Sequence, residues 1–216
     1  MQAGDSGEGA SIKASRADLD IRWAKAEEAR AIARLFLISS DGLAAYIWSR
    51  IGMPGRKSEE VGLEENGLEE VGAARYARSG TAFSYENCLL ALAGGDVVGM
   101  AHAFPMEADP GPVEEEDPVL RPYAELEDPG SLYLSGLAVE ENYRGTGIGA
   151  ELMDCVEELA RAKGLPRVSL ICFERNMRAL AFYRRRGYRE IARRPLVAHP
   201  SLHYADGDAL LLVRDC

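Results

Sequence analysis

The chain has 216 residues, of which 47% are hydrophobic and 28% charged, and its formal net charge is -10 at pH 7. These values are typical of a soluble globular protein, and the acidic balance argues against general nucleic-acid binding, which needs an electropositive surface. Because no apolar run is long enough to span a bilayer, we expect no membrane partner either.

The first residues have neither the basic start nor the apolar stretch of a secretory signal. Residues 1–17 are rich in small and polar residues, and we predict a flexible tail there, followed by a single α/β domain over residues 18–216. The cysteines are scattered without metal-ligand or redox spacing, as expected for reduced thiols in a cytoplasmic protein. The three histidines show no metal-binding spacing, and we predict no metal site.

The first half of the chain predicts one strand and several helices. Residues 19–23 alternate apolar and polar side chains as a half-buried strand does, and residues 26–38 carry apolar side chains at helical spacing. A second helix is predicted over residues 43–51, and a third over residues 68–78. The acidic, glycine-bearing residues 57–67 between them are predicted to form a loop.

The middle of the chain predicts a hairpin and a long loop. Residues 88–93 and 97–103 are apolar and flank a Gly-Gly-Asp turn signal, which favours two antiparallel strands. Residues 105–130 contain six prolines and many acidic residues, without helical or strand periodicity. We predict a long loop there, of the kind that can cover a binding site.

The last third predicts alternating strands and helices. A nearly all-apolar strand over residues 132–139 precedes an amphipathic helix over residues 148–163. A strand over 167–173 and a helix over 176–186 follow, and strands over 188–194 and 209–213 complete the domain.

A glycine-rich turn joins the strand over 132–139 to the helix that follows it. Its sequence is Arg144-Gly145-Thr146-Gly147-Ile148-Gly149. Free backbone N–H groups and the positive end of the helix dipole at such a turn favour phosphate binding, and glycines let phosphates approach the backbone. The arginine adds a fixed positive charge.

The spacing of this turn argues against two common phosphate-binding motifs. A Walker A loop requires Lys-Ser or Lys-Thr after its last glycine, and Ala150 and Glu151 stand there instead. A dinucleotide fingerprint requires GxGxxG, whereas these glycines follow a GxGxG pattern. A tight connection without a ligand remains the structural alternative.

The R-x-x-G-x-G pattern after an apolar strand resembles motif A of the GCN5-related N-acetyltransferases, the GNAT superfamily. The segment Asn176-Met177-Arg178-Ala179-Leu180-Ala181-Phe182-Tyr183-Arg184-Arg185-Arg186-Gly187-Tyr188 is similar to motif B of that family. The resemblance is clearest over residues 132–191. It implies a mixed, mostly antiparallel central sheet flanked by helices, with a parallel pair of strands splayed at the cofactor site.

The resemblance also implies which residues bind acetyl-CoA. The strand would contact the pantetheine arm and the turn would hold the pyrophosphate, with Asn176 and Tyr183 lying along the cofactor. The implied cofactor-binding residues are Leu137, Ala138, Val139, Arg144, Gly145, Thr146, Gly147, Ile148, Gly149, Ala150, Asn176 and Tyr183. Tyr183 would protonate the departing thiolate, unless it is only a packed core aromatic. Capping of its helix is the alternative role of Asn176, and the two roles do not exclude each other.

The general base is not evident from the sequence. Many relatives carry a glutamate on the strand before motif A, but residues 132–137 hold no carboxylate. We predict Glu86 or His102 as the base, with His199 and His203 as weaker candidates. We predict that residues 123–127 and the helices near Tyr46 and Trp48 line the acceptor pocket. Residues 184–186 form either a solvated helix face or a contact to the cofactor's 3′-phosphate.

The sequence therefore predicts an enzyme that transfers an acetyl group from acetyl-CoA to a primary amine by direct attack. Because the chain is acidic, a cationic small-molecule acceptor is slightly favoured over a protein. A non-catalytic acyl-CoA sensor with the same fold is the alternative, and Tyr183 favours the enzyme because a sensor needs no proton donor. The same resemblance is compatible with a homodimer, because many relatives pair through their C-terminal strands.

Overall fold

The structure is a computed structural model that describes residues 19–51 and 65–216. Seven strands form one sheet in the order β1-β2-β3-β4-β5-β7-β6. The strands are β1 (Leu19–Trp23), β2 (Cys88–Ala93), β3 (Asp96–Pro105), β4 (Leu132–Val139), β5 (Arg167–Phe173), β6 (Arg189–Pro195) and β7 (Asp208–Asp215). All neighbouring strands are antiparallel except β4 and β5, which are parallel. The predicted fold class is confirmed.

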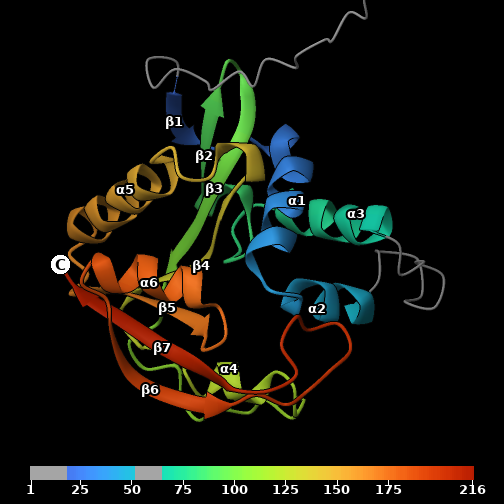
Figure 1. The fold of residues 1–216 in the computed structure, drawn as a ribbon, viewed down its shortest axis with the longest axis vertical. Coiled ribbons are helices and arrows are strands. Elements are labelled where there is room, and N and C mark those ends of the chain that lie inside the picture. Colours follow the sequence, from blue (N-terminus) through green and yellow to red (C-terminus); the bar gives the residue numbers. More distant parts are fainter. Residues whose placement is uncertain (1–18, 52–64) are drawn as a thin grey trace, which may run out of the picture.

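Helices cover both faces of the sheet (Figure 1). On one face lie α1 (Ala29–Ser39), α2 (Leu43–Ile51) and α3 (Glu65–Tyr76), and on the other lie α5 (Ile148–Ala162) and α6 (Met177–Arg185). The alternation of β2 reflects this arrangement, because Leu89 packs with the α5 side and Leu90 with the α1 side. A strand covered on both faces needs apolar residues throughout, which explains the unbroken apolar runs.

The α5 helix shows how the sequence pattern becomes packing. Leu152, Met153 and Val156 recur at helical spacing, and none of the three exposes any surface. Truncating a fully buried leucine such as Leu152 to alanine typically costs about 2–5 kcal/mol of stability, because the cavity fills only in part. The packing of this stripe fixes the start of α5 against the end of β4.

Several predicted boundaries are corrected by the structure. The first helix is preceded by a 3-10 turn over Ala26–Glu28, and the third helix begins at Glu65, before the predicted residue 68. The predicted structureless segment 105–130 contains the short helix α4 (Arg121–Ala124), which begins at a proline-bearing turn. The predicted tail over residues 1–17 and most of the predicted loop over residues 57–67 lie outside the described residues.

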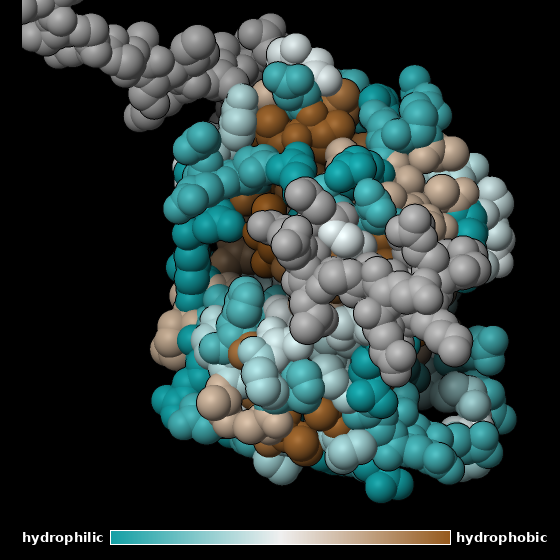
Figure 2. All heavy atoms as spheres, turned by 90° about the vertical axis from the view of Figure 1, so that its right-hand side faces the viewer, coloured by the Kyte–Doolittle hydropathy of each residue, from teal (hydrophilic) through white to brown (hydrophobic). Residues whose placement is uncertain are grey.

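Figure 2 shows the molecule from the side of α2 and α3, where hydrophilic side chains predominate and hydrophobic ones appear in patches between them. In the part of the chain that the structure covers, no helix is long and apolar enough to cross a membrane. The four thiols, those of Cys88, Cys155, Cys172 and Cys216, are all free, and the first and third are buried.

Candidate functional site

A cleft of about 1090 Å³ opens where the two parallel strands separate. Leu132, Tyr133 and Leu134 of β4 pair with residues 168–170 of β5, and the pairing ends there. Beyond that point β4 still pairs with β3 on its other edge, as far as Val139. The edge of β4 that faces the gap therefore presents backbone groups that the sheet does not satisfy.

The glycine-rich turn forms one end of this cleft. Gly147 is the N-cap of α5 with φ 102°, so no side chain caps the first N–H groups of the helix, although the Ala150 N–H donates to the Gly147 carbonyl at 2.9 Å. A Cβ atom at residue 147 would meet no neighbour within 4 Å, so space is open over the backbone. Thr146 points away, because its hydroxyl donates to the carbonyl of Tyr143 at 2.7 Å.

Arginine side chains lie beside the turn and elsewhere along the cleft. The Nε of Arg144 donates to the carbonyl of Val139 at 3.0 Å, which anchors the side chain beside the turn. Arg178 and Arg185 of α6 also line the cleft. An arginine beside a helix start that has no side-chain cap is an arrangement that favours binding of a phosphate or pyrophosphate.

Most of the predicted cofactor-binding residues line this cleft. Ten of the twelve do so: Leu137, Ala138, Val139, Arg144, Gly145, Gly147, Gly149, Ala150, Asn176 and Tyr183. The exceptions are Thr146 and Ile148, whose side chains form a turn hydrogen bond and pack in the core, respectively. Their cofactor-binding role stays a prediction that could involve only their backbone.

Tyr183 lies on the wall of the cleft with its ring packed in the core. Burial raises the pKa of its phenol far above the ordinary value, and the nearby charges of Cys172, Tyr188 and Asp41 add to that shift. The phenol therefore stays protonated at neutral pH. No hydrogen bond joins its hydroxyl to another residue in the part of the chain described, so the proton is available to a ligand.

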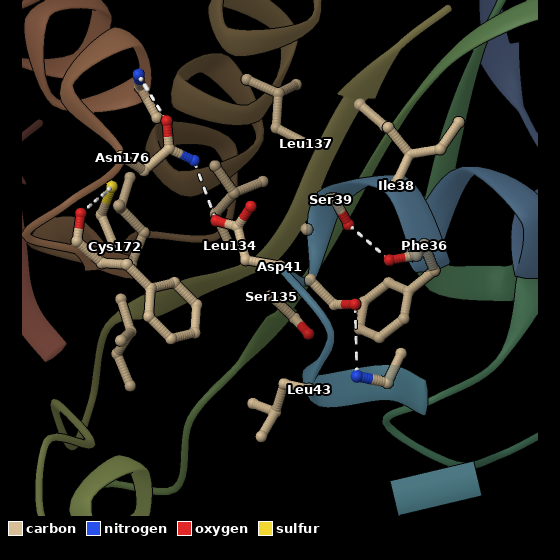
Figure 3. A pocket seen from close by; sticks show the side chains of 18 of the residues that line it. Phe36, Ile38, Ser39, Asp41, Leu43, Leu134, Ser135, Leu137, Cys172 and Asn176 are labelled. Atoms are coloured by element: carbon tan, nitrogen blue, oxygen red, sulfur yellow. Dashed lines mark hydrogen bonds between the residues drawn. The ribbon is translucent and has the colours of Figure 1, made fainter. Parts of the chain in front are cut away.

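Asn176 is the N-cap of α6, and its Oδ1 accepts from the Ala179 N–H at 3.1 Å. Its Nδ2 donates to a carboxylate oxygen of Asp41 at 2.9 Å (Figure 3). The capping role considered from the sequence is present. No local pattern in the sequence indicates the second contact, because Asp41 lies 135 residues earlier in the chain.

The two predicted bases do not reach the cleft. His102 is fully buried, with Nε2 2.9 Å from the Ala82 carbonyl and Nδ1 3.3 Å from the Tyr76 hydroxyl. Because a carbonyl only accepts, Nε2 carries the proton, and burial lowers the pKa of His102 to about 4. Glu86 accepts from the Gly80 N–H at 2.7 Å on the surface. No contact supports a catalytic role for either residue.

The opposite wall of the cleft is assembled from distant segments. Of the residues expected at the acceptor pocket, Trp48, Tyr123, Ala124 and Glu127 line it. Tyr46 does not, because it is buried and its hydroxyl donates to Asp117 at 2.7 Å. Residues that sequence reasoning missed also line it: Asp41, Arg75, Phe83, Phe104, Glu115, Tyr133, Ser135 and Tyr204.

One glycine allows this wall to come close. A Cβ atom at Gly136 of β4 would lie 2.8 Å from the Ser39 hydroxyl and 2.9 Å from the Phe36 ring. The end of α1 can therefore approach the strand only where the side chain is absent. This contact brings the α1–α2 turn, with Asp41, to the gap between β4 and β5.

The remaining predicted residues have structural partners. Of the run at residues 184–186, Arg185 lines the cleft, whereas Arg186 bonds to Asp154 at 2.5 Å and to Glu157. One interpretation of the sequence placed residues 184–186 on a solvated helix face, and for Arg186 the structure contradicts it. Among the described residues, no group of three or more His, Cys, Asp or Glu side chains is placed to hold a metal ion.

Comparison with known proteins identifies the fold. The acetyltransferase (GNAT) family profile matches residues 57–188. A solved structure of a Drosophila melanogaster polyamine N-acetyltransferase, 18% identical, aligns with a TM-score of 0.61 over 92% of this chain and 100% of that one. An N-acetyltransferase from Staphylococcus aureus Mu50, also 18% identical, aligns with a TM-score of 0.56 over 90% and 100% of the two chains. A search of curated protein sequences gives no match.

Proposed function

The chain belongs to the GNAT acetyltransferase family, whose members transfer acetyl groups from acetyl-CoA, and we propose that it transfers one to a primary amine by direct attack. One observation carries the proposal. A single continuous cleft runs from a helix start that has no side-chain cap and an arginine beside it, past an unpaired strand edge, to a protonated tyrosine and a polar, aromatic wall.

The residues present fit acetyl-CoA in three respects. The glycine turn and Arg144 suit the pyrophosphate, because no Cβ atom blocks the approach to the N–H groups. The free edge of β4 from residue 135 onward offers backbone partners to the amide groups of a pantetheine arm. Tyr183 and Asn176 lie beyond the turn along the same cleft, where the thioester would end.

We name the two sides of the cleft by these roles. The donor wall consists of the end of β4, residues 144–150 and the side of α6 that faces the cleft. The acceptor wall consists of the α1–α2 turn, Phe83, Phe104, Tyr204 and the residues between 115 and 127 that line the cleft: Glu115, Leu120, Tyr123, Ala124 and Glu127. Holding the amine and the thioester between these walls makes their encounter effectively unimolecular.

The chain's own groups supply the polar catalysis. A backbone N–H near Leu137 stabilises the negative charge that develops on the carbonyl oxygen. The hydroxyl of Tyr183 donates its proton to the departing sulfur, which burial favours by keeping the phenol protonated. The aromatic side chains of the acceptor wall exclude water from the thioester.

A small cationic amine is the acceptor we favour. The chain carries a net charge of -10, and Asp41, Glu115 and Glu127 line the acceptor side of the cleft. A carboxylate-bearing pocket attracts an ammonium group. Protein amino groups remain the second candidate, and a non-catalytic acyl-CoA sensor is the candidate from another class. Tyr183, which lines the cleft, favours an enzyme.

A turnover assay tests the proposal. The purified chain is incubated with acetyl-CoA and, in turn, benzylamine, putrescine, agmatine, a peptide with a free amino terminus and a peptide with an internal lysine. Thiol release is followed spectroscopically, and acetylated products are identified by mass spectrometry. We expect amine-dependent thiol release with at least one small amine. Binding of acetyl-CoA without transfer to any of these acceptors would support the sensor instead.

A further inference from the structure

Asp41 lies in the turn between α1 and α2 in an uncommon backbone conformation. Its φ is 48°, and within residues 19–51 and 65–216 no other non-glycine residue has a positive φ. Aspartate and asparagine tolerate this region better than most residues do. The turn is fixed from outside, because the His203 N–H donates to the Asp41 carbonyl at 2.9 Å. The backbone thus holds the side chain in a defined direction.

That direction is into the cleft. Figure 3 shows the Asp41 carboxylate between Asn176 and the part of β4 that carries Leu134 and Ser135. This is the position where β4 and β5 stop pairing. Only 15% of the Asp41 side chain is exposed, so the carboxylate has lost most of its water.

The partners of this carboxylate differ from those of similarly buried acids. Four other carboxylates with at most 14% exposed side chains each form an ion pair with an arginine: Glu69, Asp117, Asp128 and Glu157. In the described part of the chain, Asp41 has no arginine or lysine within ion-pair distance. Its partners are the neutral amide of Asn176 and the imidazole of His203, whose Nδ1 lies 3.6 Å away. No arginine or lysine among the described residues balances this carboxylate, and an ammonium substrate would supply a fixed positive charge.

Asp41 and the predicted proton donor, Tyr183, both line the cleft. The negative charge of Asp41 contributes to the raised pKa of Tyr183, after burial and the effects of Cys172 and Tyr188. After burial, it also contributes to raising the pKa of Cys172, on β5, to about 12. Asp41 contacts the start of α6 through Asn176, and Tyr183 lies on the same helix.

We propose that Asp41 is the catalytic base that binds the acceptor's ammonium group and removes its proton, and that Asn176 is the residue that positions it. This inference rests on the proposed acetyl transfer and names the group that the sequence left unassigned. Desolvation raises the pKa of Asp41 above the ordinary aspartate value, which brings its basicity closer to that of a useful base.

The step balances within the groups named. The ammonium nitrogen gives one proton to a carboxylate oxygen of Asp41, and its freed electron pair forms the C–N bond with the thioester carbon. The C–S bond breaks, and the thiolate takes the proton of the Tyr183 hydroxyl. The second proton leaving the nitrogen restores Tyr183. Asp41 finally releases its proton to solvent, so one ammonium ion and one thioester give one amide, one thiol and one proton.

Asn176 acts through Asp41. Because its Oδ1 is committed to the helix cap, its amide can turn only with difficulty, and its Nδ2 stays directed at the carboxylate. The hydrogen bond from Asn176 lowers the pKa of Asp41, but burial outweighs it, and a neutral donor lowers that pKa less than a positive charge would. An arginine at position 176 would lower the pKa of Asp41 further and make it a weaker base.

Other titratable groups face Asp41, and the experiment must distinguish their effect on the pH profile from that of Asp41. They come from several elements: His203 and Tyr204 before β7, Cys172 of β5, Tyr183 of α6 and Tyr123 of α4. Glu115 and Glu127 are the competing carboxylates on the same wall, and burial raises the pKa of Glu127. The test therefore includes Glu115→Gln, Glu127→Gln and His203→Gln.

The main variant is Asp41→Asn. Asparagine keeps the size, tolerates the left-handed backbone and can still accept from Asn176, so the fold is preserved. With the amine that the wild type acetylates fastest among the five acceptors above, we expect kcat/KM at pH 7 to fall by about 10²–10⁴. The Kd for acetyl-CoA, measured by calorimetry, stays unchanged.

The pH profile distinguishes a base from a structural residue. Without a base, the variant depends on free amine already present in solution, so its deficit shrinks as the pH rises toward the alkylamine pKa of about 10. In the wild type the acid limb lies above the ordinary aspartate pKa, because protonated Asp41 accepts no proton. If protonation of Asp41 causes the acid limb of the wild-type profile, the same limb is present in His203→Gln.

Asn176→Ala lowers kcat/KM by less than Asp41→Asn does, and the losses of the two substitutions are not additive in the double variant.

Each outcome decides between the two proposals. A deficit that is equal at every pH, or one that appears in Glu115→Gln or Glu127→Gln and not in Asp41→Asn, would overturn the assignment of Asp41 while leaving the acetyltransferase intact. A wild type that binds acetyl-CoA and acetylates none of the five acceptors would overturn the proposed function, and this inference with it.

Discussion

The donor wall comes almost entirely from one stretch of chain, whereas the acceptor wall is assembled from segments spread over most of it. On the donor side, β4, the turn and the start of α5 follow one another between Leu132 and Ala150, and only α6 is added. On the acceptor side, the α1–α2 turn meets residues 115–127 and Tyr204. Binding of the acetyl donor therefore depends on local backbone geometry, whereas the choice of acceptor depends on tertiary packing.

Tyr183→Phe has the largest effect expected on the donor wall. We expect kcat to fall by about 10²–10⁴ with the Kd for acetyl-CoA unchanged, because the ring stays and only the proton is lost. Tyr188→Phe is the matched control. Its ring lies 5.7 Å from that of Tyr183, and its buried hydroxyl has no partner among the described residues. Equal turnover of the two variants would contradict the acid role.

His102 tests whether a residue beside the acceptor wall is buried and neutral. Its pKa falls from 6.5 to about 4 in the folded chain, so between these values the unfolded state binds more protons. The free energy of unfolding is therefore unaffected by His102 titration above pH 6.5. It decreases as the pH falls toward 4, by about 3 kcal/mol in total. Urea unfolding at several pH values measures this loss. His102→Gln should unfold with a weaker pH dependence, and an unchanged dependence would show that His102 titrates normally.

Gly147→Asp tests the backbone of the turn. A side chain at φ 102° strains the chain, and a carboxylate at the helix start repels phosphate, so we expect the Kd for acetyl-CoA to rise at least about 100-fold. Gly164→Asp is the control, because Gly164 also has a positive φ and open space but lies past the end of α5. Calorimetry should find its affinity unchanged. Equal losses in both variants would attribute the effect to strain.

Arg144→Ala has the smallest effect expected. Arg144 is exposed, so the loss of one charge-assisted contact should raise the Kd by about 10-fold, and by less at high salt. Arg189→Ala removes a similarly exposed arginine that pairs with Asp215 away from the cleft. Affinity that is insensitive to Arg144 would place the pyrophosphate elsewhere.

The difference between the walls also explains what the sequence could predict. The glycine turn and the helix over residues 176–186 were accessible, because strand, turn and helix signals follow one another and the motif lies within them. Ten of the residues predicted from them line the cleft. Sheet order was less accessible, since β7 inserts between β5 and β6.

The base could not be predicted, because nothing local distinguishes its candidates. His102 is attractive by residue type, but its neighbours Tyr76 and Ala82 bury and satisfy it. Asp41 is followed by Gly42, which signals only a turn. Its approach to Asn176 depends on the absence of a side chain at Gly136, a packing effect between α1 and β4. Short carboxylates in turns become interpretable only once the tertiary contacts are known.

Calorimetric titration of the wild-type chain with acetyl-CoA, with ATP and NAD titrated in parallel, tests the central claim most directly. We expect saturable binding of one acetyl-CoA per chain and no binding of the two nucleotides. Binding of ATP or NAD in place of acetyl-CoA, or no binding of acetyl-CoA at all, would contradict the assignment of the cleft to an acetyl donor.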